Sequence, residues 1–182
     1  QLASLSGITS IAAGSIHSLA VKNDGTAWAW GRNVAGQLGD GTTADKSSPV
    51  QVTGLSGITA LAGGGSHSLA RKNDGTVWAW GNNSYGELGN GTNTSRNTPA
   101  QTALLSSVTA VAAGGSHSLA FRSDGSAWAW GSNRNGQLGN ASNTDSNVPV
   151  LVGAGVAAAP VLSPGDGTYN PPQRVSMSSA TS

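Results

Sequence analysis

Serine, histidine and aspartate occur together in a pattern that a hydrolase could use. His17 and Ser18 are adjacent, and Asp24 follows within the next turn of the chain. A nucleophile, a general base and an orienting carboxylate are the parts of a catalytic triad. The trio recurs fifty and one hundred residues later, as His67, Ser68 and Asp74 and as His117, Ser118 and Asp124. A catalytic constellation ordinarily occurs once per domain, so the recurrence favours structural roles, with histidine bonding to backbone and aspartate holding a turn.

Neither a metal site nor a phosphate-binding loop fits the repeated residues. The three histidines could suggest a metal site, but equivalent positions on face-packed sheets lie about 10 Å apart, whereas zinc needs nitrogens about 2.1 Å from one centre. The glycine-rich stretch 36–41 lacks the Lys-Ser/Thr pair and the helix start of a phosphate-binding loop. We therefore expect no catalytic residue, no metal and no cofactor.

The elements that position these residues form a strict internal repeat of fifty residues. The histidines keep this spacing, and so do three pairs of tryptophans in Trp-x-Trp segments: Trp28 and Trp30, Trp78 and Trp80, Trp128 and Trp130. No insertion or deletion disturbs the period. Repetition at such a period is typical of solenoids and propellers.

Each repeat has the pattern of four short strands. In the first copy we expect strands at 8–13, around 17–20, at 28–30 and at 49–52, with a tight hairpin turn at 23–26 where glycine supplies a positive φ. Four strands per fifty residues is typical of a propeller blade. The sequence predicts an all-β fold, a β-propeller-type array of three four-stranded blades in an incomplete ring.

Alternation along the Trp-Ala-Trp strand places both rings on one face and the alanine on the other. Each ring can bury about 200 Å², so the tryptophans should supply much of the contact between neighbouring repeats. The polar residues that recur after them are expected to satisfy backbone groups in tight loops: Asn33, Asn83, Asn133, Gln37, Glu87 and Gln137.

Composition excludes several classes of protein. Charged residues make up 9% of the chain and the net charge is +1, so no basic stripe could neutralise a nucleic acid backbone. Cysteine is absent, which excludes disulfides and thiolate metal sites. No run approaches the roughly 20 apolar residues of a membrane span, and we expect no membrane insertion.

Three spaced motifs carry a family resemblance. Gly-x-x-His-Ser-Leu-Ala, Asp-Gly-Thr/Ser-x-Trp-Ala-Trp-Gly-x-Asn and Gly-Gln/Glu-Leu-Gly recur in order in all three copies. They resemble the regulator of chromosome condensation repeats, the bacterial members in particular, over residues 1 to about 155. The resemblance implies blades of a seven-bladed propeller.

The repeat boundaries predict the organisation of the chain. We expect a propeller array at 1–156, with repeats at 8–57, 58–107 and 108–156 after the end of an earlier repeat at 1–7. Residues 157–182 are expected to form a linker and a truncated β segment, which resembles the opening of chitobiase-type C-terminal β-sandwich domains.

Positions that vary between the copies are the candidates for partner contacts, because the constraints of the scaffold are shared by all copies. The best candidates are Arg32, Tyr85, Arg96, Phe121 and Arg134. Drift of unconstrained loops would produce the same variation, so both interpretations stay open.

These observations predict a non-enzymatic module for protein interaction or assembly, secreted or on a bacterial cell surface. We expect its open blade faces to be completed by further repeats of a longer chain, by other copies in a homo-oligomer, or by the tail as a donated strand. One alternative is an inhibitor that covers the active site of a secreted enzyme with its loop face. A remote one is a chromatin protein acting as a guanine nucleotide exchange factor, as in the family's eukaryotic founder.

Overall fold

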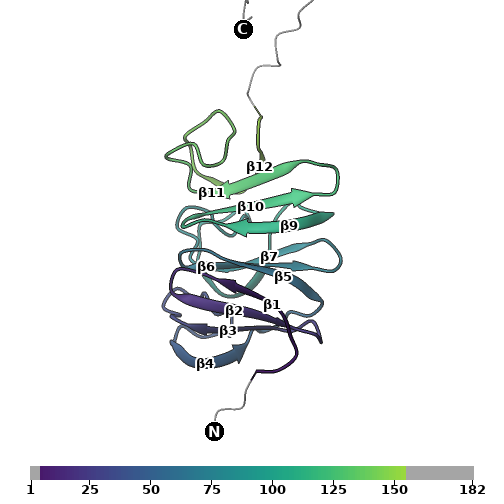
Figure 1. Cartoon of the computed structure of the whole chain (residues 1–182). Helices are drawn as coiled ribbons and strands as arrows, with labels where there is room; N and C mark the ends of the chain where they lie inside the picture. Colours follow the sequence, from purple (N-terminus) through teal and green to yellow (C-terminus); the bar gives the residue numbers. More distant parts are fainter. Residues whose placement is uncertain (1–4, 155–182) are drawn as a thin grey trace, which may run out of the picture.

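The structure, a computed structural model, describes residues 5–154 as three four-stranded antiparallel sheets that follow one another along the chain (Figure 1). The first blade contains β1 (Ile8–Ala13), β2 (His17–Lys22), β3 (Ala27–Gly31) and β4 (Lys46–Gln51). The second contains β5 (Ile58–Gly63), β6 (His67–Lys72), β7 (Val77–Gly81) and β8 (Arg96–Gln101). The third contains β9 (Val108–Ala113), β10 (His117–Arg122), β11 (Ala127–Gly131) and β12 (Ser146–Leu151). The predicted all-β blades are confirmed.

The hairpin turn between β2 and β3 forms as its residues predict. Gly25 has a φ of +76°, and its amide donates to the carbonyl of Lys22 at 2.9 Å. Asp24 Oδ1 accepts from the backbone amide of Thr26 at 3.0 Å and from its hydroxyl at 2.6 Å. Aspartate therefore holds the turn, as predicted.

The fourth strand begins earlier than predicted, at Lys46 instead of Pro49. It lies at the outer edge of its sheet, in the order β1-β2-β3-β4. An edge strand has one side without ladder bonds, so it accommodates proline inside the strand. The register with β3 also shifts between Ala29 and Gly31, which relaxes the pairing there.

The blades pack face to face through two apolar cores. Strand β5 packs on β1 and β2, and β9 packs on β5 and β6. Trp80 in the first core and Trp130 in the second are fully buried. Trp78 and Trp128 lie partly buried against the same cores. Both rings of a pair therefore face the preceding blade, and the alternation predicted for the Trp-Ala-Trp strand is confirmed.

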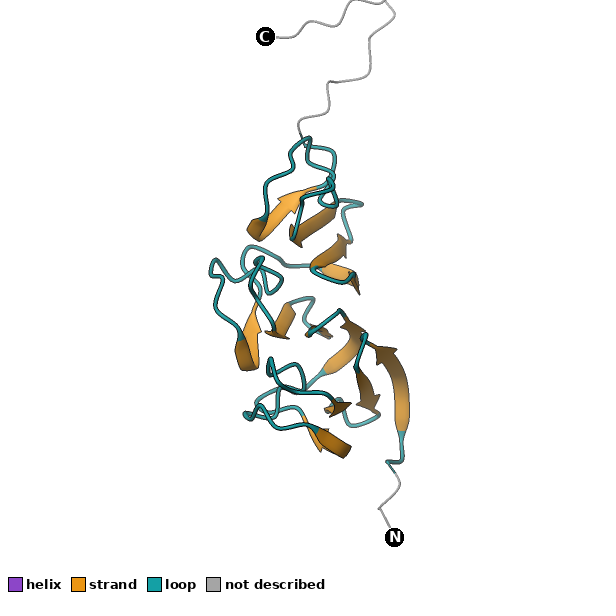
Figure 2. Ribbon diagram, turned by 90° about the vertical axis from the view of Figure 1, so that its left-hand side faces the viewer, coloured by secondary structure: helices purple, strands orange, loops and turns teal. Residues whose placement is uncertain are grey.

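The three blades form an open row, with the described ends of the chain on opposite blades (Figure 2). The described sheets do not close into a ring. The tail from 157 onward, with its predicted β segment, lies outside the described residues. Within 5–154, no helix has the length and apolarity needed to cross a membrane.

Candidate functional site

The contact between the first and second blades, which we call the first joint, contains a buried chain of polar groups. His17 Nε2 lies 2.8 Å from Ser68 Oγ, and that hydroxyl donates to the carbonyl of Gln37 at 2.8 Å. The hydroxyl has one proton, and it donates this proton in the hydrogen bond to the carbonyl. The hydroxyl oxygen must therefore accept a hydrogen bond from the histidine. His17 is therefore the neutral tautomer with its proton on Nε2.

The second joint, between the second and third blades, repeats this chain. His67 Nε2 lies 3.0 Å from Ser118 Oγ, which donates to the carbonyl of Glu87 at 2.8 Å. The prediction that histidine bonds to backbone is wrong: its partner is the serine of the following blade, which relays the bond to a backbone carbonyl. In the sequence each histidine is adjacent to the serine of its own blade, so the pairing with the serine of the following blade could not be predicted.

The aspartates of the repeated trio take no part in these chains. Asp74 accepts from the amide and the hydroxyl of Thr76 at an exposed hairpin, as Asp24 does in the first blade. The histidine and serine that do meet thus lack an orienting carboxylate, and the trio does not assemble as a triad. Within 5–154 no three His, Asp or Glu side chains are grouped to hold a metal ion.

Burial keeps the joint histidines neutral. The pKa of His17 and of His67 is lowered from 6.5 to about 4, by burial in both cases and, for His67, also by the neighbouring histidines. A buried imidazolium would have neither solvent nor a counter-ion, which disfavours the charged form. At neutral pH both rings are therefore available as donors to serine.

One carbonyl in each joint accepts from two side chains of the following blade. Trp80 Nε1 donates to the carbonyl of Gln37 at 2.8 Å, beside Ser68. Trp130 Nε1 donates to the carbonyl of Glu87 at 2.7 Å. These carbonyls connect the blades, and sequence reasoning missed them because a backbone oxygen has no residue-type signature.

Glycine makes room for these rings. Gly39 has a φ of +69°, and a Cβ there would lie 2.8 Å from Trp80 Nε1. Gly89 repeats this against Trp130, with a φ of +63°. The Gly-Gln/Glu-Leu-Gly motif therefore forms the seat for the next blade's tryptophan.

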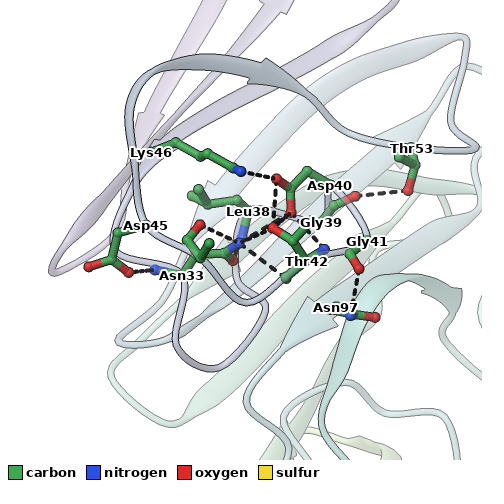
Figure 3. A network of polar contacts seen from close by, with 11 residues as sticks. Asn33, Leu38, Gly39, Asp40, Gly41, Thr42, Asp45, Lys46, Thr53 and Asn97 are labelled. Atoms are coloured by element: carbon green, nitrogen blue, oxygen red, sulfur yellow. Dashed lines mark hydrogen bonds and ion pairs between the residues drawn. The ribbon is translucent and has the colours of Figure 1, made fainter.

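The loops after β3, β7 and β11 are organised by the recurring asparagine. Asn33 Oδ1 accepts from the amide of Leu38 at 2.9 Å, while its Nδ2 donates to the carbonyls of Thr42 and Ala44 at 3.1 Å each (Figure 3). Asn83 and Asn133 make equivalent bonds. The expectation that these residues satisfy loop backbone is confirmed.

The glutamine or glutamate of the same loop also bonds to backbone. Gln37 Oε1 accepts from the amide of Ala35 at 3.0 Å, and Glu87 Oε2 accepts from the amide of Tyr85 at 2.9 Å. Burial raises the pKa of Glu87, and the nearby charge of Asp145 raises it further. One of these loops thus carries an ionisable group where another has a neutral amide.

The candidate contact residues fall into four places. Arg134 stacks on Tyr85, with its guanidinium carbon 5.1 Å from the ring centroid. Arg96 is exposed beside a groove at the first joint, and Arg32 is exposed on the loop after β3. Phe121 lies within β10, on the open face of the third blade, so it is not a loop residue.

The two end blades expose faces whose equivalents are buried in the joints. On the first blade, Ile8 and Ile11 are 37% and 77% exposed, whereas Ile58 and Leu61 are 3% and 8% exposed. On the third blade, Phe121 and Val152 are 47% and 38% exposed, whereas Val21 and Val52 are each 1% exposed. An apolar hollow of about 260 Å³ lies beside Phe121, lined mainly by alanines. Both ends therefore expose a surface of the kind that the joints bury.

Comparison with known proteins identifies the repeat. The family model described as RCC1-like domain matches residues 1–167. The fold is similar to human WBSCR16, with 28% identity and a TM-score of 0.73 over 83% of this chain. It is also similar to yeast RCC1 (Prp20) in complex with Kap60, with 25% identity and a TM-score of 0.73 over 80% of this chain.

A separate crystal structure of Prp20p from Saccharomyces cerevisiae, a protein characterised for its binding to Gsp1p and histones, is 26% identical, with a TM-score of 0.69. The match covers 80% of this chain. The chain spans only 39%, 37% and 38% of these three proteins, in the order given.

Proposed function

Because this chain belongs to the RCC1-like domain family, we propose that it is an interaction and assembly module whose two end faces bind further blades of the same kind. These blades would come from more repeats or from another subunit. The observation that supports the proposal is the equivalence of the exposed end faces with the faces buried in the two joints.

Hydrogen bonding complements this apolar equivalence. Trp30 is only partly buried, and its Nε1 has no acceptor among residues 5–154, whereas Trp80 and Trp130 donate across their joints. At the other end, the Gln137 carbonyl, equivalent to those of Gln37 and Glu87, accepts no hydrogen bond from the described residues. The donor at one end matches the acceptor at the other.

A second copy of the chain could bind these ends through contacts of the same kinds as those in the two joints. The face of the third blade corresponds to the faces of the first and second blades that already bind a following blade. The face of the first blade corresponds to the faces that already bind a preceding one. Such an interface is heterologous, joining the tail of one copy to the head of the next. Burying exposed side chains of the size of Ile11 and Phe121 contributes about 1.5–3 kcal/mol each.

Two exposed substitutions test this arrangement without disturbing either joint. Ile11→Glu places a charge on the first blade's open face, and Phe121→Glu places one on the third blade's open face. In sedimentation velocity, the wild-type chain should associate with concentration, and each variant alone should stay monomeric. An equimolar mixture of the two should form a dimer and nothing larger, since only one intact pair of faces remains.

Val34→Glu is the matched control, because Val34 is an exposed apolar residue on a loop and not on an end face. This variant should associate like the wild type. A wild-type chain that stays monomeric at high concentration would overturn completion by a second copy. Association of either single variant at wild-type strength would show that some other surface is responsible.

The known relatives support protein partners as well. Yeast RCC1 was crystallised with Kap60, and Prp20p binds Gsp1p and histones. The near-neutral charge of this chain gives no comparable support for nucleic acid. We therefore propose that proteins, and not nucleic acids, are the partners of its surfaces.

A further inference from the structure

A groove on the loop surface crosses the first joint, away from the open ends. It has a volume of about 530 Å³ and is lined by Val34, Ala35, Thr43, Asn82, Ser95, Arg96 and Asn97. Its two walls are fastened together, because Asn97 Nδ2 donates to the Gly41 carbonyl at 2.8 Å and the Gly41 amide donates to the Asn97 carbonyl at 2.9 Å (Figure 3). The groove is therefore formed before any partner arrives.

Arg96 provides the single charge in this lining. Its equivalent in the first blade, Lys46, pairs with Asp40 at 3.5 Å, but in the second blade Asn90 stands in the place of Asp40. No salt bridge involves Arg96 within the described chain. The second blade thus keeps the cation and lacks its carboxylate.

The neutral groups around Arg96 also have donors to spare. Asn82 Oδ1 accepts from the amide and hydroxyl of Ser84 at 2.9 and 2.8 Å, which leaves its Nδ2 to donate. Ser95 Oγ accepts from the amide of Asn83 at 3.1 Å, which leaves its hydroxyl proton to donate. In the first blade the position of Ser95 holds a carboxylate, Asp45. The lining offers a cation and donors with no acid.

A buried neutral amide also distinguishes the first joint from the second. Gln37 is fully buried, and its Nε2 has no hydrogen-bond partner in the described structure. Its equivalent Glu87 is close enough to Asp145 to sense its charge, and Asp145 corresponds to Ser95. By this equivalence Gln37 lies near Ser95, so the first joint has a neutral amide where the second joint has the carboxyl group of Glu87.

The corresponding place at the second joint contains a carboxylate, and the nearby cation Arg134 lies over the Tyr85 ring. There Asp145 replaces Ser95, Ser146 replaces Arg96, and Tyr85 replaces the small Ala35. Two places with the same backbone thus differ in charge and in the size of the side chain at the position of Ala35. At the first joint an anionic ligand would meet a cation and no carboxylate in the lining.

We propose that this groove binds the carboxylate of a glutamate or aspartate side chain of a protein partner, held by the Arg96 guanidinium. A planar guanidinium donates two parallel bonds to a carboxylate, and Val34 and Ala35 supply an apolar surface for the methylene groups beside it. A single cation suits a singly charged carboxylate better than a phosphate dianion. The inference rests on the proposed role in protein binding, but it does not depend on the end faces.

The test uses a fluorescein-labelled peptide of alternating glutamate and alanine, titrated with the full chain and followed by fluorescence anisotropy. A peptide with glutamine in place of every glutamate is the matched probe. The acidic peptide should bind saturably and the glutamine peptide at least tenfold more weakly. Arg96→Gln should weaken binding of the acidic peptide about tenfold, the effect of one charge-assisted pair.

Two further variants separate this site from general electrostatics. Asn90→Asp restores the carboxylate of the first blade beside Arg96, so it should weaken binding about as much as Arg96→Gln while the cation stays in place. Arg134→Gln removes an exposed cation outside the groove and should leave binding unchanged. Equal losses from Arg134→Gln and Arg96→Gln would overturn the assignment of the site.

Competition identifies the anion, and the end-face variants separate this inference from the assembly of blades. Acetate should displace the peptide at lower concentration than inorganic phosphate does, and the reverse order would overturn the carboxylate assignment. Ile11→Glu and Phe121→Glu should bind the peptide like the wild type. A chain that assembles through its ends but fails to bind the acidic peptide would refute the groove alone.

Discussion

The first and second joints share a frame of contacts but differ in the charge built into it. In both, one carbonyl accepts from a serine and a tryptophan of the next blade, and a histidine donates to that serine. The residue that carries the carbonyl is Gln37 in one joint and Glu87 in the other. The hydrogen bonds from side-chain donors to the backbone acceptor are therefore the same in both joints. They form whether the residue that carries the carbonyl is a glutamine or a glutamate.

A second difference concerns the position occupied by Val21 and Arg71. Val21 is buried in the apolar core of the first joint. Arg71 instead donates from Nε to the Val108 carbonyl at 2.6 Å and from Nη1 to Thr59 Oγ1 at 2.8 Å. This position accommodates either an apolar side chain or an arginine, because the guanidinium group can reach a carbonyl of the following blade.

The shared frame predicts equal losses when its tryptophans are removed. Trp80→Ala and Trp130→Ala should each lower the free energy of unfolding by about 3–5 kcal/mol, since each leaves a large cavity and removes one of the two hydrogen bonds that the carbonyl accepts. Trp30→Ala should cost less than half as much in the monomer, because that ring is partly exposed. Urea unfolding followed by circular dichroism measures these losses. A clear inequality between Trp80→Ala and Trp130→Ala would show that the two joints are not equivalent.

The joint histidines predict a loss of stability in acid. Their pKa is about 4 in the folded chain and 6.5 when unfolded, so the unfolded state binds more protons between these values. The stability they contribute is complete above pH 6.5 and is lost as the pH falls to about 4, at about 1.4 kcal/mol per pH unit for each histidine. Each therefore accounts for about 3 kcal/mol over this window.

Urea unfolding at a series of pH values measures this slope. A folded His67→Gln variant is the control, and it should lose about half of the pH dependence. Stability that stays flat between pH 6.5 and 4.5 would show that the rings are not buried as neutral donors.

The sequence was enough to predict the blades and their internal geometry. The period of fifty, the Asp-Gly turn and the alternation of Trp-Ala-Trp are local signals, and local backbone preference decides those elements. The packing of the tryptophans between blades was predictable as well, but the hydrogen bonds between blades were not. His17 has Ser18 beside it and Ser68 across the joint, and strict repetition gives both serines the same sequence context. The start of β4 was also missed, because proline suits the first position of a strand as well as an edge strand, and the sequence does not show that β4 begins three residues before Pro49.

Replacing Glu87 with glutamine, the residue that the first joint has at the equivalent position 37, should stabilise the chain. Its pKa is raised, mainly by burial, so the folded state disfavours its charge and the chain is less stable above that pKa than below it. Glu87→Gln keeps an acceptor for the Tyr85 amide, as Gln37 does for Ala35. It should stabilise the chain at pH 7 by about 0.5–2 kcal/mol.

This gain should vanish as the pH falls and Glu87 itself becomes protonated. Thermal unfolding at pH 7 and at pH 4.5 measures both values. The conservative control is Gln37→Glu, which should reproduce the penalty in the first joint. An equal gain at both pH values would attribute the effect to packing and not to charge.

The smallest predicted effect concerns the ion pair that only the first blade has. Asn90→Asp should let Arg96 pair as Lys46 pairs with Asp40, and a partly exposed pair of this kind adds about 0.2–1 kcal/mol. The gain should shrink in high salt, because exposed charges are screened. Thermal unfolding at low and at high ionic strength measures it, with Asn90→Asp in an Arg96→Gln background as the control. If the gain survives removal of Arg96, it comes from the loop turn at this position. Asn90 already holds that turn by accepting from the amide and the hydroxyl of Thr92. The two blades would then differ in no interaction that depends on this cation.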